Sequence, residues 1–171
     1  MLKFLVNLCK QKIDNMKVNY IGLDSEKTGV VINKLNHLLA DYQQFYMNIR
    51  GFHWNVKGNS FFELHVKFEE IYTDINLKVD EIAERILALD GTPLHSFTDY
   101  QKISKVKETK NLTEGKEMVG VLLADFKTLI EAQRDILAEA GENSDEGTVS
   151  LMSDYITEHE KTMWMLKAYL A

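Results

Sequence analysis

Apolar residues recur every three to four positions over four long stretches of this chain, and the first stretch runs from about residue 28 to residue 52. This spacing brings apolar side chains together on one face of an α-helix and leaves polar side chains on the opposite face. The pattern therefore predicts an amphipathic helix whose buried face consists of Val31, Leu35, Leu38, Tyr42, Phe45, Ile49 and Phe52.

Three further helices follow from the same periodicity and from residues that favour helix ends. The second is expected over residues 60–89, because a serine suits its first turn and Asp90 with Gly91 supplies a turn after it. The third is expected over residues 113–140. The fourth should begin near Ser144 and continue to the last residues of the sequence.

Proline and glycine are sparse, with one proline and nine glycines among 171 residues. Because residues that interrupt helices are so few, the chain is expected to be all-α. Short links join the first helix to the second and the third to the fourth, so each pair should form an antiparallel hairpin. The link over residues 90–112 is long enough to cross the full length of a four-helix bundle, with a short helix expected from Tyr100 to Lys105.

The segment before the first helix has a different character from the rest of the chain. Residues 1–23 lack a sustained apolar period and contain four lysines, so we expect a mobile arm followed by a bundle over residues 24–171. Met16 is a second possible start of translation. The single cysteine, Cys9, rules out an internal disulfide. The apolar run at residues 4–6 is too short for a signal segment or a membrane span, so a cytoplasmic protein is expected.

The formal net charge of the chain is −6, and its pI is about 5.4. An acidic body repels DNA phosphate and attracts cations, so metal is favoured over nucleic acid as a ligand. The lysines of the arm leave one alternative open, which is a nucleoid protein that binds DNA through residues 1–23. For the body of the protein we expect DNA binding to be weak or absent.

Five side chains in and just before the second helix carry groups that bind divalent metals. Two imidazoles and three carboxylates form a mixed nitrogen and oxygen set that suits ferrous iron. At about 100° per residue, the four residues within the helix form one stripe that points away from the core, and we expect this stripe to exclude apolar residues. The five residues are His53, His65, Glu69, Asp80 and Glu84.

One helix cannot close such a site, because about 22 Å separate His65 from Asp80 along the helix axis. The ligands of one metal must lie within a few ångströms of each other. If two copies of the chain pack antiparallel about a two-fold axis, the residues near His65 of one copy meet those near Asp80 of the other. The sequence thus predicts a homo-oligomer with two identical sites at a dimer interface.

Other interpretations of these residues remain open. Acidic side chains on an outward helix face are commonly solvated, and a histidine and glutamate four residues apart commonly make only a weak surface contact. The same contacts would also occur in a protein that forms a purely structural shell and whose metal-binding residues are inactive. An intrachain di-iron centre of the usual kind is excluded, because no histidine in this chain has a glutamate three residues before it.

Two motifs in this region resemble the signatures of the Dps family, also called mini-ferritins. The first reads HWNVKG at residues 53–58, followed by a leucine and histidine at 64–65 and by the acid Glu69. The second reads VDEIAER at residues 79–85, followed by glycine and proline. The last helix ends in KTMWMLKAYL, which is similar to the usual ending of the family. The resemblance therefore covers the chain from about residue 24 onward.

The resemblance implies a ferritin-like four-helix bundle that assembles as a hollow dodecamer. It also implies oxidation of Fe²⁺ with hydrogen peroxide as the preferred oxidant, storage of the ferric mineral, and protection against oxidative stress. His53, His65 and the acid at 69 would come from one subunit, and Asp80 and Glu84 from its two-fold partner. Many members have aspartate where this chain has Glu69, so the longer side chain is expected to affect coordination.

The resemblance also bears on residues outside this set. In the family a tryptophan near the site can take up oxidising equivalents, a role open to Trp54, for which simple packing is an equal alternative. Independently of the resemblance, His159 falls on the core-facing side of the fourth helix, so it is expected to be a hydrogen-bonded core histidine and not a ligand. Four acidic residues near the start of the fourth helix either line three-fold pores for iron entry or form a solvated helix cap: Glu142, Asp145, Glu146 and Asp154.

Overall fold

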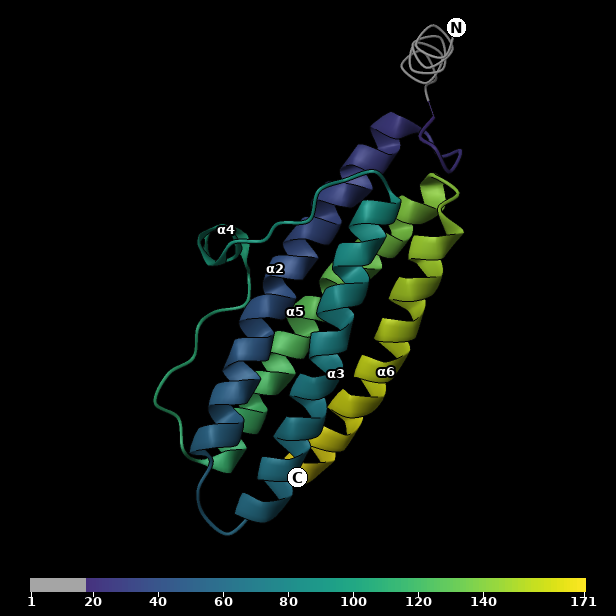
Figure 1. Ribbon diagram of the computed structural model, residues 1–171. Helices are drawn as coiled ribbons and strands as arrows, with labels where there is room; N and C mark the ends of the chain where they lie inside the picture. Colours follow the sequence, from purple (N-terminus) through teal and green to yellow (C-terminus); the bar gives the residue numbers. More distant parts are fainter. Residues whose placement is uncertain (1–17) are drawn as a thin grey trace, which may run out of the picture.

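A computed structural model describes residues 18–171, which form five α-helices and no β-strand. Figure 1 shows four long helices side by side as a bundle, with a long connection that carries the fifth, short helix along the outside of α2. The prediction of an all-α four-helix bundle with a long crossover is confirmed. The helices are α2 Ser25–Asn55, α3 Phe61–Ala88, α4 Phe97–Ile103, α5 Gly115–Glu142 and α6 Glu146–Leu170.

The core of the bundle lies where α2 packs against α3 and α5, and α5 against α6. Phe45 and Phe126 meet edge to face with ring centroids 4.8 Å apart, a favourable geometry for two aromatic rings. The apolar face predicted for the first helix is buried throughout. Its largest fully buried neighbours from other helices are Phe68, Ile75, Ile82, Ile86 and Phe126.

His159 is the polar exception inside this core, as expected from the sequence. It is 2% exposed, and its Nδ1 lies 3.1 Å from the side-chain nitrogen of Gln133. Burial, together with the nearby positive charge of Lys78, lowers the pKa of His159 to about 3. The imidazole is therefore neutral at pH 7, and the prediction of a hydrogen-bonded core histidine is confirmed.

The crossover between α3 and α5 is held to α2 by one buried carboxylate. Asp41 accepts a hydrogen bond from the hydroxyl of Ser104 at 2.9 Å, and the backbone N–H groups of residues 105 and 106 also donate to it. These contacts begin where α4 ends. The short helix runs from Phe97 to Ile103 and not from Tyr100 to Lys105, because Ser96 caps its start by accepting from the N–H of Asp99.

The chain before α2 is ordered over the residues that the structure describes. The side-chain oxygen of Asn19 accepts hydrogen bonds from the backbone N–H groups of Ile21 and Leu23, which closes a turn. Asp24 then caps α2 by accepting from the N–H groups of the first helical turn, so this helix begins three residues earlier than predicted. The predictions for residues 1–17, including those for Cys9 and Met16, lie outside the described part.

A buried polar cluster ties the end of α3 to the start of α6. The guanidinium of Arg85 donates to the hydroxyl of Thr148 at 2.8 Å and is ion-paired with Asp145, which is 2% exposed. Asp145 also caps α6 by accepting from the backbone N–H of Thr148. Asp145 is therefore neither a solvated cap nor an open pore residue, because its carboxylate is enclosed by Arg85 and Thr148. Glu142, Glu146 and Asp154 are exposed.

Candidate metal site

The two predicted histidine ligands meet at the link between α2 and α3. His53 lies in the last turn of α2 and His65 in the second turn of α3. Their rings stack with centroids 3.8 Å apart and planes 19° from parallel. The Nδ1 of each ring lies 2.8 Å from the backbone carbonyl oxygen of the other residue. The sequence placed both residues in one site, and the structure brings them into contact.

This reciprocal pairing determines which nitrogen of each ring keeps a free lone pair. A carbonyl oxygen only accepts hydrogen bonds, so Nδ1 must carry the proton in each neutral ring. The lone pair then resides on Nε2, which is the state that binds a metal ion. The carbonyl of His53 is available as an acceptor because it belongs to the last turn of α2, where carbonyl groups lack a partner within the helix.

Glu69 lies one helical turn beyond His65, on the same side of α3. Its carboxylate is exposed and accepts a hydrogen bond of 3.4 Å from the hydroxyl of Tyr72. Partial burial and the neighbouring Glu69 raise the pKa of Tyr72, so this hydroxyl stays protonated and remains a donor. The edge of Tyr72 also packs against His53, with ring centroids 5.4 Å apart. The sequence analysis did not predict that Tyr72 contacts this site. The only sequence signal for the contact is that Tyr72 lies three residues after Glu69, on the same side of the helix.

Asp80 and Glu84 lie farther along α3, on the same outward side. Both are exposed, and among residues 18–171 neither has a hydrogen-bond or ion-pair partner. About 22 Å of helix separates Asp80 from His65. Within the part of the chain that the structure describes, no three histidine, cysteine, aspartate or glutamate side chains are placed to hold a metal ion. The five predicted ligands thus form two separate groups in one subunit.

The outward side of α3 is not purely polar, contrary to the sequence-based expectation. Apolar side chains alternate with the predicted ligands along the whole helix. At about 100° per residue they fall within the same stripe, roughly 40–120° around the helix from His65. A soluble helix rarely exposes so many large apolar side chains unless another surface covers them. The residues and their exposed fractions are Phe62 80%, Val66 52%, Leu77 60% and Leu87 56%.

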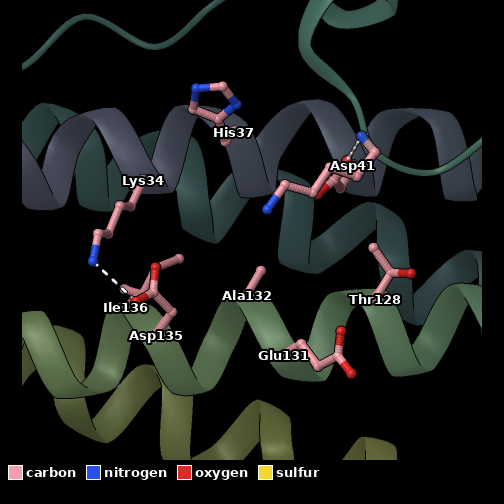
Figure 2. A pocket seen from close by; sticks show the side chains of 9 residues that line it. Lys34, His37, Asp41, Thr128, Glu131, Ala132, Asp135 and Ile136 are labelled. Carbon is pink, nitrogen blue, oxygen red and sulfur yellow. Dashed lines mark hydrogen bonds and ion pairs between the residues drawn. The ribbon is translucent and has the colours of Figure 1, made fainter.

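The groove between α2 and α5 has a different character. It has a volume of about 310 Å³, and Figure 2 shows Lys34 and His37 of α2 on one side with Asp135 of α5 on the other. Lys34 is ion-paired with Asp135 at 3.1 Å and with Glu139 at 2.8 Å. None of the five predicted ligands lines this groove. Its charges are largely paired with each other, so the geometry favours the α3 face as the metal site.

Within residues 18–171, no helix is long and apolar enough to cross a membrane.

A family model described as a ferritin-like domain matches residues 32–171 of the chain. The DNA protection during starvation protein of Porphyromonas gingivalis is 41% identical over 148 residues, which cover 86% of this chain and 93% of that protein.

Solved structures agree with this match. The DPS protein from Vibrio cholerae O1, described as a member of a broad superfamily of ferritin-like diiron-carboxylate proteins, has a TM-score of 0.90 and 54% identity. The match covers 91% of this chain and 98% of that one. Dps from Staphylococcus aureus has a TM-score of 0.80 and 37% identity, covering 82% and 95%. In both sequence and fold, the chain belongs to the ferritin-like domain family and, within it, to the Dps proteins.

Proposed function

We propose that this chain is the subunit of a hollow dodecamer that oxidises Fe²⁺ at sites shared between two subunits and stores the ferric product. One observation carries the proposal. His53, at the end of α2, adjoins His65 and Glu69 on the outward side of α3. Asp80 and Glu84 lie about 22 Å away on the same side of α3, and among the described residues neither group places three ligands to hold a metal ion.

A two-fold axis through the middle of this side would complete both sites. Two antiparallel copies of α3 would bring His65 of one subunit to Asp80 of the other, and symmetry would repeat the contact. The same contact would cover the exposed Phe62 and Leu77. Burial of apolar surface contributes about 25 cal/mol per Å², so these side chains would stabilise the interface that forms the sites.

The chemistry of the shared site follows from its donor groups. Imidazole nitrogen and carboxylate oxygen both bind Fe²⁺, and the negative carboxylates stabilise Fe³⁺ more than Fe²⁺. Loss of an electron from bound iron is therefore favoured. The pairing of His53 with His65 holds both Nε2 atoms ready without any rearrangement. The hollow dodecamer, hydrogen peroxide as the oxidant, and protection from oxidative stress in the cytoplasm rest on the resemblance to Dps proteins.

Relatives of this chain support the iron assignment over the nucleic-acid alternative. The Vibrio cholerae protein is described as ferritin-like and diiron-carboxylate, which fits the carboxylates on α3. The Porphyromonas gingivalis relative is named for DNA protection. In this chain the formal net charge of −6 opposes contact with phosphate, so protection of DNA by removal of iron and peroxide fits better than direct binding.

Substitution of one ligand from each group tests the proposal. We expect His65→Ala and Asp80→Asn each to slow Fe²⁺ oxidation at least about tenfold, since each removes a direct ligand. Asp135→Asn removes an exposed carboxylate from α5 and serves as the matched control. Oxidation is followed by absorbance after addition of hydrogen peroxide, with assembly size measured by light scattering. Wild-type rates in both ligand variants, in correctly sized assemblies, would contradict the proposal.

A further inference from the structure

The guanidinium of Arg50 is surrounded by three aromatic rings beside the proposed iron site. Its central carbon lies 4.9 Å from the ring centroid of Trp54, 5.5 Å from that of Tyr46 and 5.6 Å from that of Tyr72. Arg50 lies one helical turn before His53 on α2, and Tyr72 packs against His53 and donates to Glu69. The cluster therefore adjoins the histidine-bearing half of the site.

Arg50 carries its charge in this cluster without a carboxylate partner. Among residues 18–171 it forms no salt bridge, and its one side-chain hydrogen bond is to the hydroxyl of Tyr46, at 3.0 Å. Its Nε atom is buried without a hydrogen-bond partner. An arginine that only contributed to stability would be expected to pair with a nearby acid. The positive charge is instead directed at the faces of electron-rich rings.

A fixed cation close to an aromatic ring opposes the loss of an electron from that ring. When an indole loses an electron it becomes a radical cation, and a positive charge about 5 Å away repels it. We propose that Arg50 raises the oxidation potential of Trp54 and so keeps this side chain reduced beside a site where iron meets peroxide. This role is the opposite of the uptake of oxidising equivalents that the resemblance left open for Trp54. The proposal concerns an electrostatic role for a residue that contacts no iron.

The oxidant in this setting is the hydroxyl radical. It forms when Fe²⁺ gives one electron to hydrogen peroxide, which leaves hydroxide and Fe³⁺. If the radical then takes an electron from Trp54, it becomes hydroxide, and the indole radical cation gives its Nε1 proton to water. By opposing this electron transfer, Arg50 favours a second Fe²⁺ as the electron donor in place of the protein. This consequence rests on the proposed function, whereas the effect of Arg50 on Trp54 does not.

The chain contains its own control for this effect. Trp164 on α6 is 68% exposed and Trp54 is 55% exposed, so both are open to a small oxidant. Among the described residues no cation lies over the ring of Trp164. Lys34 offers a charge-matched control, because it lies on the same helix as Trp54, about 30 Å away along the axis, and pairs with Asp135 and Glu139.

The test uses the iron-free full-length assembly and azide radical, which removes one electron from indoles and becomes azide anion. Peptide mass spectrometry measures the oxidised fraction of each tryptophan. We expect Arg50→Gln to oxidise Trp54 about threefold faster or more relative to Trp164, and Arg50→Lys, which keeps the charge, to remain near wild type. Lys34→Gln should leave the ratio unchanged.

Equal ratios in wild type and Arg50→Gln would overturn the proposal, and so would an Arg50→Lys variant that behaves like Arg50→Gln. The second result would mean that ring packing, and not charge, protects Trp54. Because no iron is present, either result leaves the proposed iron oxidation untouched. Conversely, an assembly that fails to oxidise Fe²⁺ would leave the azide measurement valid.

Discussion

Asp125 on α5 is an acidic side chain enclosed almost entirely by protein. It is 9% exposed, and one carboxylate oxygen accepts a hydrogen bond of 3.2 Å from the side chain of Asn48. Burial, with a smaller contribution from the negative charge of Asp41, raises the pKa of Asp125 to about 6, although the hydrogen bond from Asn48 acts in the opposite direction. At neutral pH this residue is therefore mostly charged in a place that favours its neutral form.

The effect of Asp125 on stability should depend on pH. Its folded pKa of about 6 lies above the ordinary 3.8, so the protonated residue stabilises the fold fully below about pH 3.8. That contribution is lost as the pH rises through about 6. We expect Asp125→Asn to raise the free energy of unfolding by about 2 kcal/mol at pH 8, because it removes the buried charge.

Chemical denaturation of both proteins at pH 8 and at pH 4.5 measures this difference. The gain from Asp125→Asn should shrink at the lower pH, where the wild-type carboxyl is protonated. Asp135→Asn, on the exposed side of the same helix, should show no such trend. A gain that is absent at pH 8, or equal at both pH values, would show that the buried charge of Asp125 does not limit stability.

The chemical type of each important residue could be predicted from the sequence better than its contacts. His159 was predicted as a core histidine because it falls on the apolar face of its helix. His53 and His65 were predicted as ligands from their motif. Their mutual hydrogen bonds could not be predicted, because these depend on how α3 folds back on α2 at the link. The three rings around Arg50 come from two helices, so no single periodic pattern indicates them.

Among the helices, α3 combines two functions in neighbouring residues. Glu84 points outward and is a predicted iron ligand, whereas Arg85 points to α6 and binds Asp145 and Thr148. A Cβ atom at Gly147 would lie 3.0 Å from the guanidinium, so glycine leaves room for this close approach. The second family motif thus contains a predicted iron ligand followed directly by a residue that joins α3 to α6.

Removal of Arg85 should therefore destabilise the subunit. Arg85→Met leaves the carboxylate of Asp145 buried without a cation, which typically costs about 3–5 kcal/mol. The double variant Arg85→Met and Asp145→Asn should lose less, because no uncompensated charge remains. Urea denaturation measures all three proteins. The exposed pair Arg134 and Glu160 is the control, and its Arg134→Gln variant should lose about 1 kcal/mol or less.

A double variant as unstable as Arg85→Met alone would contradict this explanation, since the loss of stability would then come from packing and not from charge.

The cluster of Arg85, Asp145 and Thr148 also shows a limit of sequence analysis at the level of helices. The acidic residues near the start of α6 were predicted as a group, but one of them, Asp145, is buried. Sixty residues separate Arg85 from Asp145, so their pairing depends on the tertiary fold and not on helical periodicity.

The subunit as a whole has one side that is incomplete in two respects. The outward side of α3 exposes large apolar side chains, and it carries predicted ligands in two groups that cannot meet within one chain. The sequence predicted the second feature from helix geometry but not the first, since the stripe that carries the ligands was expected to exclude apolar residues. We propose that one antiparallel contact between α3 and a second copy of the chain accounts for both features. The proposed function depends on this contact.

Co-assembly of two inactive variants tests this claim most directly. One chain carries His65→Ala and Glu69→Ala, and the other carries Asp80→Ala and Glu84→Ala. In a mixed dimer, one of the two sites receives both intact groups. Random mixing in equal amounts makes about half the dimers mixed, so Fe²⁺ oxidation should recover to about a quarter of the wild-type rate. No recovery, in assemblies that mass spectrometry shows to contain both chains, would contradict a site shared between subunits.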